Sequence, residues 1–207
     1  MQKSFGKRIR FFDKTPPDIV CPHFYELVWA RGCPYDCAWC YLQGTYRIQG
    51  KQPYFYPRNE VAHSLYLLWV KSKEPIILNT GELADSLMGE NLKEPFSTFL
   101  ATFLLSPPHK ALFLSKMTNV KNLLEIVDHV KDRFILSWSL NADPVARRWE
   151  KGAPPVQDRI DAAKKCADAG YQVRVRIDPM APVPIWLLLY RQLIDQIFAN
   201  FTPERIT

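Results

Sequence analysis

Residues 75–79 read Pro-Ile-Ile-Leu-Asn, a short apolar run that contains no charged residue. A run of this length is typical of a strand buried on both faces, as in a parallel sheet that helices cover. Helical patterns flank the run. Residues 59–71 precede it, with Asn59 as the expected N-cap. Residues 94–105 follow it, with Pro95 in the first turn, where proline is tolerated. The run therefore predicts a strand between two helices, the unit that builds α/β folds.

The same alternation extends along the chain. The other expected strands cover residues 24–30, 111–115, 133–140 and 171–177, and the other expected helices cover residues 119–130, 156–169 and 184–200. The helix at 119–130 is predicted to bury one face, made of Val120, Leu123, Leu124, Val127 and Val130. Repeated strand–helix units predict a parallel sheet with right-handed crossovers. Five units and the start of a sixth strand at residues 205–207 predict a partial (β/α)6-type parallel barrel, truncated there as in a fragment or split product.

The expected barrel begins at residue 24. Before it, Lys14-Thr15-Pro16-Pro17 blocks regular structure. Residues 1–23 are therefore predicted to form an irregular N-terminal segment, and residues 24–207 an incomplete barrel core. The 207 residues suit one domain of this kind.

Composition narrows the class of protein. Hydrophobic residues make up 47% of the chain and charged residues 23%, which is typical of a globular protein. No apolar run reaches the roughly 18 to 20 residues that cross a bilayer. Residues 1–10 are basic but lack the apolar stretch of a secretory signal, so a cytoplasmic location is expected and no membrane partner. The formal charge of +6 slightly favours anionic partners such as nucleic acid, although an ordinary solvated surface explains it equally well.

Directly after the first expected strand, residues 32–41 read Gly-Cys-Pro-Tyr-Asp-Cys-Ala-Trp-Cys-Tyr. Three of the five cysteines, Cys33, Cys37 and Cys40, have the spacing Cys-x3-Cys-x2-Cys, while Cys21 and Cys166 stand alone. This layout favours metal binding in a reducing compartment over a disulfide framework. Three soft thiolates can hold three corners of an iron–sulfur cubane and leave its fourth iron open. Structural zinc usually takes four ligands, and would need Cys21, Cys166 or a distant histidine as the fourth.

Polar side chains follow the other strands, at the edge where βα barrels form their active sites. These candidates are Gly81 and Glu82 after the second strand, Ser115 and Lys116 after the third, Ser139 and Asn141 at the end of the fourth, and Arg174 and Arg176 on one face of the fifth. Glu82 can accept hydrogen bonds from an ammonium group, and Lys116 can contact a carboxylate or phosphate. Two arginines on one strand face need anions if that face is interior. Turn chemistry and surface solvation are the alternatives for each of these residues.

The cysteine loop resembles the cluster motif of the radical S-adenosylmethionine superfamily, Cys-x3-Cys-x-aromatic-Cys, with Trp39 at the aromatic position. The resemblance implies a partial six-unit barrel and a 4Fe-4S cluster on Cys33, Cys37 and Cys40. It implies that S-adenosylmethionine is cleaved reductively to a 5′-deoxyadenosyl radical that abstracts hydrogen from a substrate. An electron donor such as flavodoxin or ferredoxin would be a partner.

Within the superfamily, the resemblance also implies contacts to the cofactor. Trp39 would pack beside the adenine, and Gly81 with Glu82 would hold the methionine amino group. Ser139 and Asn141 would bond the ribose hydroxyls or the carboxylate. Lys116 and Arg176 are further candidate contacts.

A closer likeness is to spore photoproduct lyase and its relatives, over residues 20–180. The stretches that carry it are Cys40-Tyr41-Leu42-Gln43, Gly81-Glu82, Asp85-Ser86, Ser115-Lys116, Ser139-Leu140-Asn141, Arg159-Ile160, Ala169-Gly170-Tyr171 and Asp178-Pro179. The likeness implies a lyase that repairs DNA, with Tyr41 matching a tyrosine that relays a hydrogen atom.

This chain departs from that branch in one respect. Those enzymes use a cysteine donor just beyond the second strand, but no cysteine occurs here between Tyr41 and Lys165, and Glu82 or a neighbour takes its place. A related reaction on another substrate is therefore an alternative to DNA repair. A non-catalytic zinc- or cluster-binding module that interacts with nucleic acid is a further alternative.

Overall fold

The computed structural model describes residues 4–13, 24–50, 52–106 and 108–206. Its main sheet has seven strands in the order β1-β2-β3-β7-β8-β9-β11. These strands are β1 (Ser4–Phe5), β2 (Ile9–Phe12), β3 (Phe24–Leu27), β7 (Ile77–Asn79), β8 (Lys110–Ser115), β9 (Phe134–Leu140) and β11 (Gln172–Ile177). From β3 onward all neighbours are parallel and follow chain order. The predicted parallel sheet is thus confirmed.

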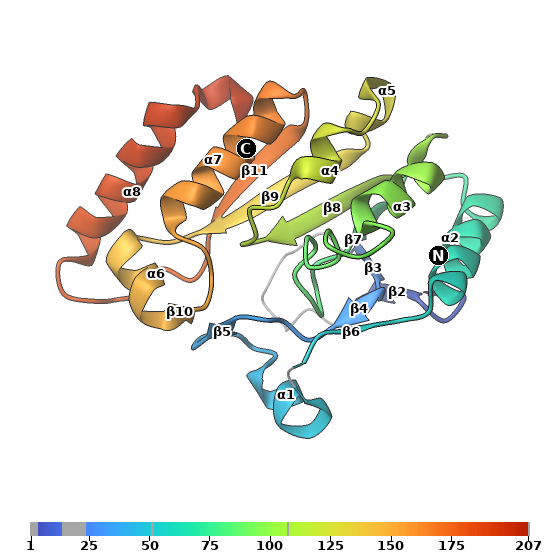
Figure 1. The fold of residues 1–207 in the computed structure, drawn as a ribbon, viewed down its shortest axis with the longest axis horizontal. Helices are drawn as coiled ribbons and strands as arrows, with labels where there is room; N and C mark the ends of the chain where they lie inside the picture. Colours follow the sequence, from blue (N-terminus) through green and yellow to red (C-terminus); the bar gives the residue numbers. More distant parts are fainter. Residues whose placement is uncertain (1–3, 14–23, 51, 107, 207) are drawn as a thin grey trace.

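The helices connect the parallel strands in sequence (Figure 1). They are α2 (Arg58–Lys71), α3 (Phe96–Leu104), α4 (Lys121–Leu124), α5 (Asp128–Lys131) and α7 (Val156–Asp168), and α8 (Trp186–Asn200) follows β11. Right-handed crossovers between successive neighbours place the connecting helices on the same face of a sheet. Alternation along β9 fits this arrangement, because Leu136 and Trp138 belong to the hydrophobic core whereas Ser137 and Ser139 point to the opposite, concave face.

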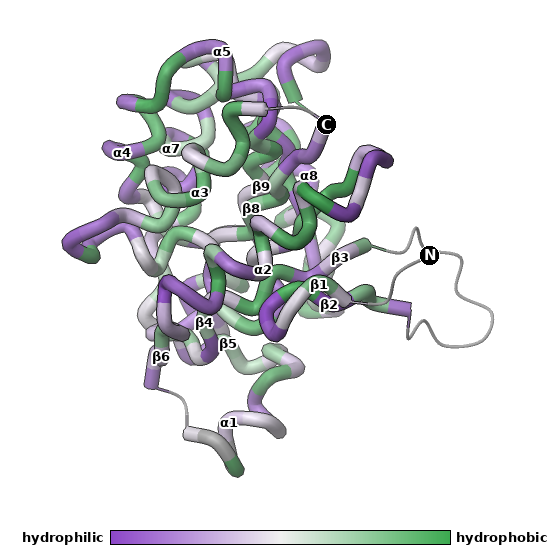
Figure 2. The backbone as a smooth tube through the Cα atoms, turned by 90° about the vertical axis from the view of Figure 1, so that its right-hand side faces the viewer, coloured by the Kyte–Doolittle hydropathy of each residue, from purple (hydrophilic) through white to green (hydrophobic). Residues whose placement is uncertain are grey.

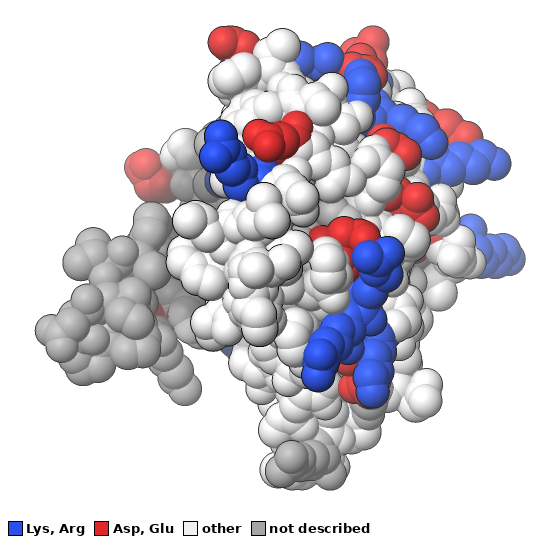
Figure 3. All heavy atoms as spheres, turned by 90° about the vertical axis from the view of Figure 1, so that its left-hand side faces the viewer, with Lys and Arg blue, Asp and Glu red and all other residues white. Residues whose placement is uncertain are grey.

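Hydropathy along the backbone alternates within the helices, as expected for elements with one buried face (Figure 2). On the molecular face shown in Figure 3, basic and acidic side chains are interspersed rather than segregated. Ion pairs such as Arg147–Asp143, at 2.9 Å, reflect this mixing. None of the described helices is long and apolar enough to span a membrane.

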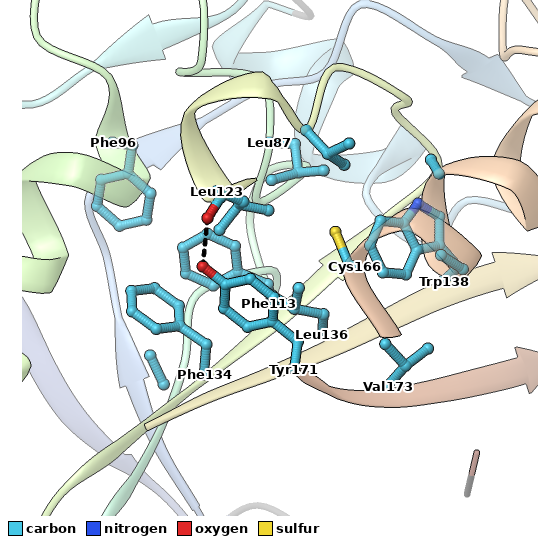
Figure 4. Close-up of a cluster of buried hydrophobic side chains, with 14 of the residues drawn as sticks. Leu87, Phe96, Phe113, Leu123, Phe134, Leu136, Trp138, Cys166, Tyr171 and Val173 are labelled. Atoms are coloured by element: carbon cyan, nitrogen blue, oxygen red, sulfur yellow. Dashed lines mark hydrogen bonds between the residues drawn. The ribbon is translucent and has the colours of Figure 1, made fainter. Parts of the chain in front are cut away.

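The core lies between the sheet and its helices. Figure 4 shows one part of it, where Phe113, Phe134 and Leu136 of the sheet meet Leu123 and Cys166. Elsewhere in the core the fully buried Trp29 stacks on Phe96, with ring centroids 3.7 Å apart. This packing fixes the strands, and therefore the loops that leave their carboxyl ends.

Several expected boundaries shift in the structure. Helix α2 begins at Arg58 after Pro57, so Asn59 is not its N-cap. Residues 119–130 form two short helices instead of one, because Val127 has extended backbone angles. As a result Leu124 and Val127, predicted to be buried, are 38% and 54% exposed. The break allows Leu123, Ile126 and Val130 to be buried together.

The prediction that residues 1–23 are irregular is wrong for residues 4–12. These form the β1–β2 hairpin, in which β2 pairs antiparallel with β3. Phe5 and Ile9 are 2% and 1% exposed, and burying these side chains explains why the segment joins the sheet. Residues 14–23, which include Cys21, lie outside the described residues.

Over the described residues the sheet does not close into a barrel, since β1 and β11 are its two edges. A short 3-10 helix, η1 (Pro203–Arg205), precedes Ile206. Ile206 forms one parallel bridge with Val173, at the edge of β11 where the sixth strand was predicted.

Candidate active site

The cysteine loop leaves the sheet after β3 through the short strand β4 (Ala30–Arg31) and contains β5 (Asp36–Cys37) and helix α1 (Gln43–Gln49). Strand β4 pairs with β6 (Tyr54–Phe55). The turn at Gly32 has a φ of +83°, a value that glycine adopts at little cost. The Gly32 N–H donates to the Leu83 carbonyl over 3.1 Å, which ties the loop to the segment after β7.

A second strand holds the cysteine loop from the other side. Helix α6 (Asp143–Trp149) leads into β10 (Glu150–Lys151), and β10 pairs antiparallel with β5, so that Glu150 lies opposite Cys37. The Ala38 N–H donates to the Trp149 carbonyl over 2.8 Å, and the Trp39 and Trp149 ring centroids are 6.3 Å apart. Neither α6 nor β10 was predicted, and together they attach the loop to the end of β9.

One cavity of about 520 Å³ lies at the carboxyl ends of the parallel strands, against the cysteine loop. The cavity is lined by every candidate residue except Asn141 and Arg174: Cys33, Cys37, Trp39, Cys40, Tyr41, Gly81, Glu82, Ser115, Lys116, Ser139 and Arg176. Tyr35, Tyr46, Asp85 and Ser137 line it as well, although the sequence argument assigned them no role. The residues come from β5, α1 and the ends of four parallel strands, so the fold assembles them from distant parts of the chain.

Glu82 and Tyr41 are in direct contact in this cavity. The Tyr41 hydroxyl lies 2.8 Å from Glu82 Oε1 and 2.5 Å from the Glu82 carbonyl oxygen. The Asn79 side-chain amide donates to Glu82 Oε2 over 3.1 Å. Although Tyr41 is 68% exposed, enclosure of its hydroxyl end and the Glu82 carboxylate both raise the pKa of the phenol. The hydroxyl therefore keeps its proton at neutral pH.

Gly81 occupies a place where no side chain fits. A Cβ added there would lie 2.5 Å from Leu114 Cβ and 3.1 Å from the Leu114 carbonyl oxygen. Asp85 fixes the rest of this segment by accepting hydrogen bonds from the Leu87 N–H, the Ser115 hydroxyl and the Lys116 N–H, at 2.9, 2.7 and 2.8 Å. The Gly-Glu segment is thus held close to the end of β8.

On the opposite wall, the Lys116 ammonium donates to the Ser139 hydroxyl over 2.9 Å. Arg176 lies 3.7 Å from Asp178 and is directed to the same cavity. Arg174 lies instead along a neighbouring hollow of about 1040 Å³ on the concave face.

Asn141 is fully buried and bonded to the Pro179 carbonyl, the Ala142 N–H and the Tyr190 hydroxyl. These contacts connect β9 with the segment after β11. Asn141 is therefore held away from the cavity that the other candidates share.

The cysteine thiols can be compared with what an iron–sulfur cluster and a zinc site each require. Burial raises the pKa of Cys33 to about 12 and that of Cys37 to about 11, so both thiols are protonated until a metal replaces the proton. Cys166 is buried in α7 and does not line the cavity, and Cys21 lies outside the described residues. Among the described residues, no three His, Cys, Asp or Glu side chains are placed to hold a single ion.

A cubane, in contrast, distributes its thiolates over different irons. The trio on one cavity wall therefore fits a cluster better than it fits a closed zinc site.

Comparison with known proteins gives one family. The family model for spore photoproduct lyase matches residues 11–207. A curated spore photoproduct lyase of Bacillus subtilis is 29% identical over 192 residues, which are 91% of this chain and 54% of that protein. A second, from a Geobacillus species, is 25% identical over 195 residues, 92% of this chain and 54% of that protein. The chain spans about half the length of the curated relatives it matches.

Solved structures show the same fold. A mutant spore photoproduct lyase with bound AdoMet and dinucleoside spore photoproduct has a TM-score of 0.77 at 20% identity, covering 93% of this chain and 55% of that one. Another spore photoproduct lyase complexed with the dinucleoside spore photoproduct has a TM-score of 0.77 at 21% identity and the same coverage. The family model covers most of the chain and the solved structures share its fold, and the chain belongs to the spore photoproduct lyase family.

Proposed function

We propose that this chain is a radical S-adenosylmethionine enzyme that holds a 4Fe-4S cluster on Cys33, Cys37 and Cys40. The observation that carries the proposal is the meeting of these three thiols with the Gly-Glu segment and Lys116 around one cavity of about 520 Å³. A cavity of this size accepts a ligand as large as a nucleoside.

When bound there, the cluster and S-adenosylmethionine would supply a 5′-deoxyadenosyl radical that abstracts hydrogen from a substrate. The protein would bind the cofactor, orient it towards the substrate and enclose both. Gly81 lets its segment pack closely against Leu114 at the end of β8. Glu82, next to it, offers carboxylate oxygens to an ammonium group. Lys116, beside Ser139, offers a cation to a carboxylate. Trp39 supplies a flat apolar wall suited to an adenine ring.

We propose Tyr41 as the catalytic residue that exchanges a hydrogen atom with the substrate. Its hydroxyl keeps its proton and is oriented by Glu82 and, through Glu82, by Asn79. No thiol other than the three proposed ligands lines the cavity among the described residues, so a cysteine donor has no counterpart there. DNA is the proposed substrate class, because relatives are solved with a dinucleoside spore photoproduct. Flavodoxin or ferredoxin is the proposed electron donor.

The experiment is anaerobic reconstitution of the full chain with iron and sulfide, followed by dithionite and S-adenosylmethionine. We expect absorption at about 400 nm from thiolate-bound iron, and release of 5′-deoxyadenosine. Cys33→Ala, Cys37→Ala and Cys40→Ala should each abolish both signals. Cys166→Ala is the matched control and should retain them, because Cys166 lies in α7 away from the cavity. Stoichiometric zinc without the absorption band, or unchanged iron in the three variants, would contradict the proposal.

The substrate class needs a separate test. Binding to a thymine-containing oligonucleotide should weaken steeply as salt rises, since contacts to phosphate release counterions. Binding that is absent at low salt would argue against DNA. Salt-dependent DNA binding by a chain that never releases 5′-deoxyadenosine would support the nucleic-acid-binding module.

A further inference from the structure

Beneath the cysteine loop lies a buried ion pair that the cofactor contacts do not explain. Arg159 Nη1 and Glu150 Oε2 are 2.5 Å apart, and their side chains are 1% and 0% exposed. Removing two charges from water is costly, so such a pair persists only where further partners complete it. Arg159 also donates to the Pro154 carbonyl over 2.8 Å and to the Ser139 carbonyl over 3.1 Å.

The pair has a third charged member. The Lys116 ammonium lies 3.7 Å from Glu150 Oε1 and donates to the Ser139 hydroxyl over 2.9 Å. The Glu150–Arg159–Lys116 network therefore connects four elements: the end of β8, the end of β9, strand β10 and helix α7. The three side chains comprise two cations and one anion, a net charge of +1, and the Asp85 carboxyl lies beside them on the Lys116 N–H.

The position of this network relates it to the metal ligands. Glu150 lies directly opposite Cys37 in the β5–β10 pair, and the adjacent Ala38 N–H is bonded to the Trp149 carbonyl. Lys116 reaches the cavity wall that the cysteines share, whereas Glu150 and Arg159 lie behind that wall. Charges buried this close to a metal centre act through a low dielectric and are screened much less than surface charges.

We propose that Glu150 and Arg159 are positioning residues that anchor the cysteine loop to the sheet, and that the Glu150–Arg159–Lys116 network sets the reduction potential of the cluster. The inference rests on the proposed cluster. Net charge and hydrogen bonding around a cluster are main determinants of its potential. An excess cation beside Cys37 makes the reduced, more negative state easier to reach.

The test is a redox titration of the reconstituted full chain, followed by the spectrum of the reduced cluster and without S-adenosylmethionine. Glu150→Gln removes the anion and should shift the midpoint potential upward. Arg159→Gln removes a cation and should shift it downward. The double variant Glu150→Gln/Arg159→Gln retains the net charge of the network and should return towards the parent value. Lys164→Gln, a surface cation paired with Asp168 on the same helix, is the matched control and should leave the potential unchanged.

If Glu150 and Arg159 only anchor the loop, both single variants would lose cluster content without shifts of opposite sign. That result would overturn the role of the network in setting the reduction potential. Where a single variant fails to fold because one buried charge loses its partner, Lys116→Gln takes its place. The Lys116 side chain is 18% exposed. Lys116→Gln should lower the midpoint potential of the cluster, as Arg159→Gln does. A parent chain that assembles no cluster would refute the proposed function itself. A parent with a cluster and variants with unchanged potentials would refute only this inference.

Discussion

Glu82 lies in the segment where this chain departs from the pattern that the resemblance implies. Its carboxylate accepts hydrogen bonds from Tyr41 and Asn79, in the region where the resemblance expects a cysteine. A carboxylate cannot give up a hydrogen atom as a thiol does, but it can orient a tyrosine hydroxyl. At the scale of single residues, the contact between Tyr41 and Glu82 is the basis of the hydrogen exchange that we propose for Tyr41.

A different residue, His109, makes stability depend on pH. It is fully buried against the edge of Trp69, 4.5 Å between ring centroids, and among the described residues neither ring nitrogen has a hydrogen-bond partner. Burial lowers the pKa of His109, so the folded state holds the neutral ring. An unfolded histidine binds a proton near pH 6.5. The contribution of neutral His109 is thus present above about pH 6.5 and is lost as the pH falls from there towards the lower folded pKa.

We expect His109→Phe, which keeps the contact with Trp69, to flatten the fall in unfolding free energy below about pH 6.5. Urea unfolding at a series of pH values measures this slope. His63→Gln, at an exposed position of α2, should leave the slope as it is. Equal slopes in the parent and in His109→Phe would show that His109 is not the group that titrates.

At the scale of elements, the two missed pieces α6 and β10 decide how the cysteine loop is held. Residues 143–151 carry no apolar period strong enough to separate them from a loop, and β10 has only two residues. Short strands form where a partner backbone is available, here β5. The elements that matter most for the site were therefore the hardest to predict.

One hydrogen bond connects two elements that are far apart in sequence. The Tyr171 hydroxyl, just before β11, donates to the Leu123 carbonyl of α4 over 2.5 Å (Figure 4). Tyr171 is 5% exposed, so losing the hydroxyl leaves a buried carbonyl oxygen without this donor. Because the Leu123 carbonyl also accepts a hydrogen bond from the Ile126 N–H at 3.2 Å, it is not left unpaired. We therefore expect Tyr171→Phe to lower the free energy of unfolding by about 0.5–1.5 kcal/mol.

Chemical denaturation measures that loss. Tyr66→Phe, at a 59% exposed position on α2, is the matched control and should stay within about 0.5 kcal/mol of the parent. A Tyr171→Phe variant as stable as the control would mean that water replaces the phenol at the Leu123 carbonyl.

For the whole molecule, the site and the core are largely separate. Of the buried residues in and around the cysteine loop, Ala30 belongs to the main hydrophobic core. Cys37, Leu42 and Tyr46 are also buried, but they are not part of that core. Removing iron from the reconstituted chain should therefore loosen the loop and leave the sheet folded. Hydrogen exchange should accelerate in residues 32–46 while the far-ultraviolet circular dichroism stays constant. Global unfolding on chelation, as in proteins whose metal supplies the folding energy, would contradict this prediction.

Local patterns were enough to predict the parallel sheet and the edge at which most of the candidate residues meet. Strands and helices can be predicted from the periodicity of apolar residues within a short stretch of sequence. The carboxyl ends of parallel strands lie at the same edge of a sheet. The cysteine trio was equally readable, because its spacing is a local property. The family match over residues 11–207 agrees with the family that these patterns resemble.

The tertiary structure alone decided which side chains touch. In the folded chain Tyr41 contacts Glu82, and Asn141 is buried in a hydrogen-bond network away from the cavity. Residues 4–12 join the sheet, and Glu150 pairs with Arg159. The physical reason is that a hydrogen bond or ion pair depends on distances of a few ångströms between groups that the chain separates by many residues. Burial then determines the strength of each contact, and burial is a property of the packed molecule rather than of any short segment.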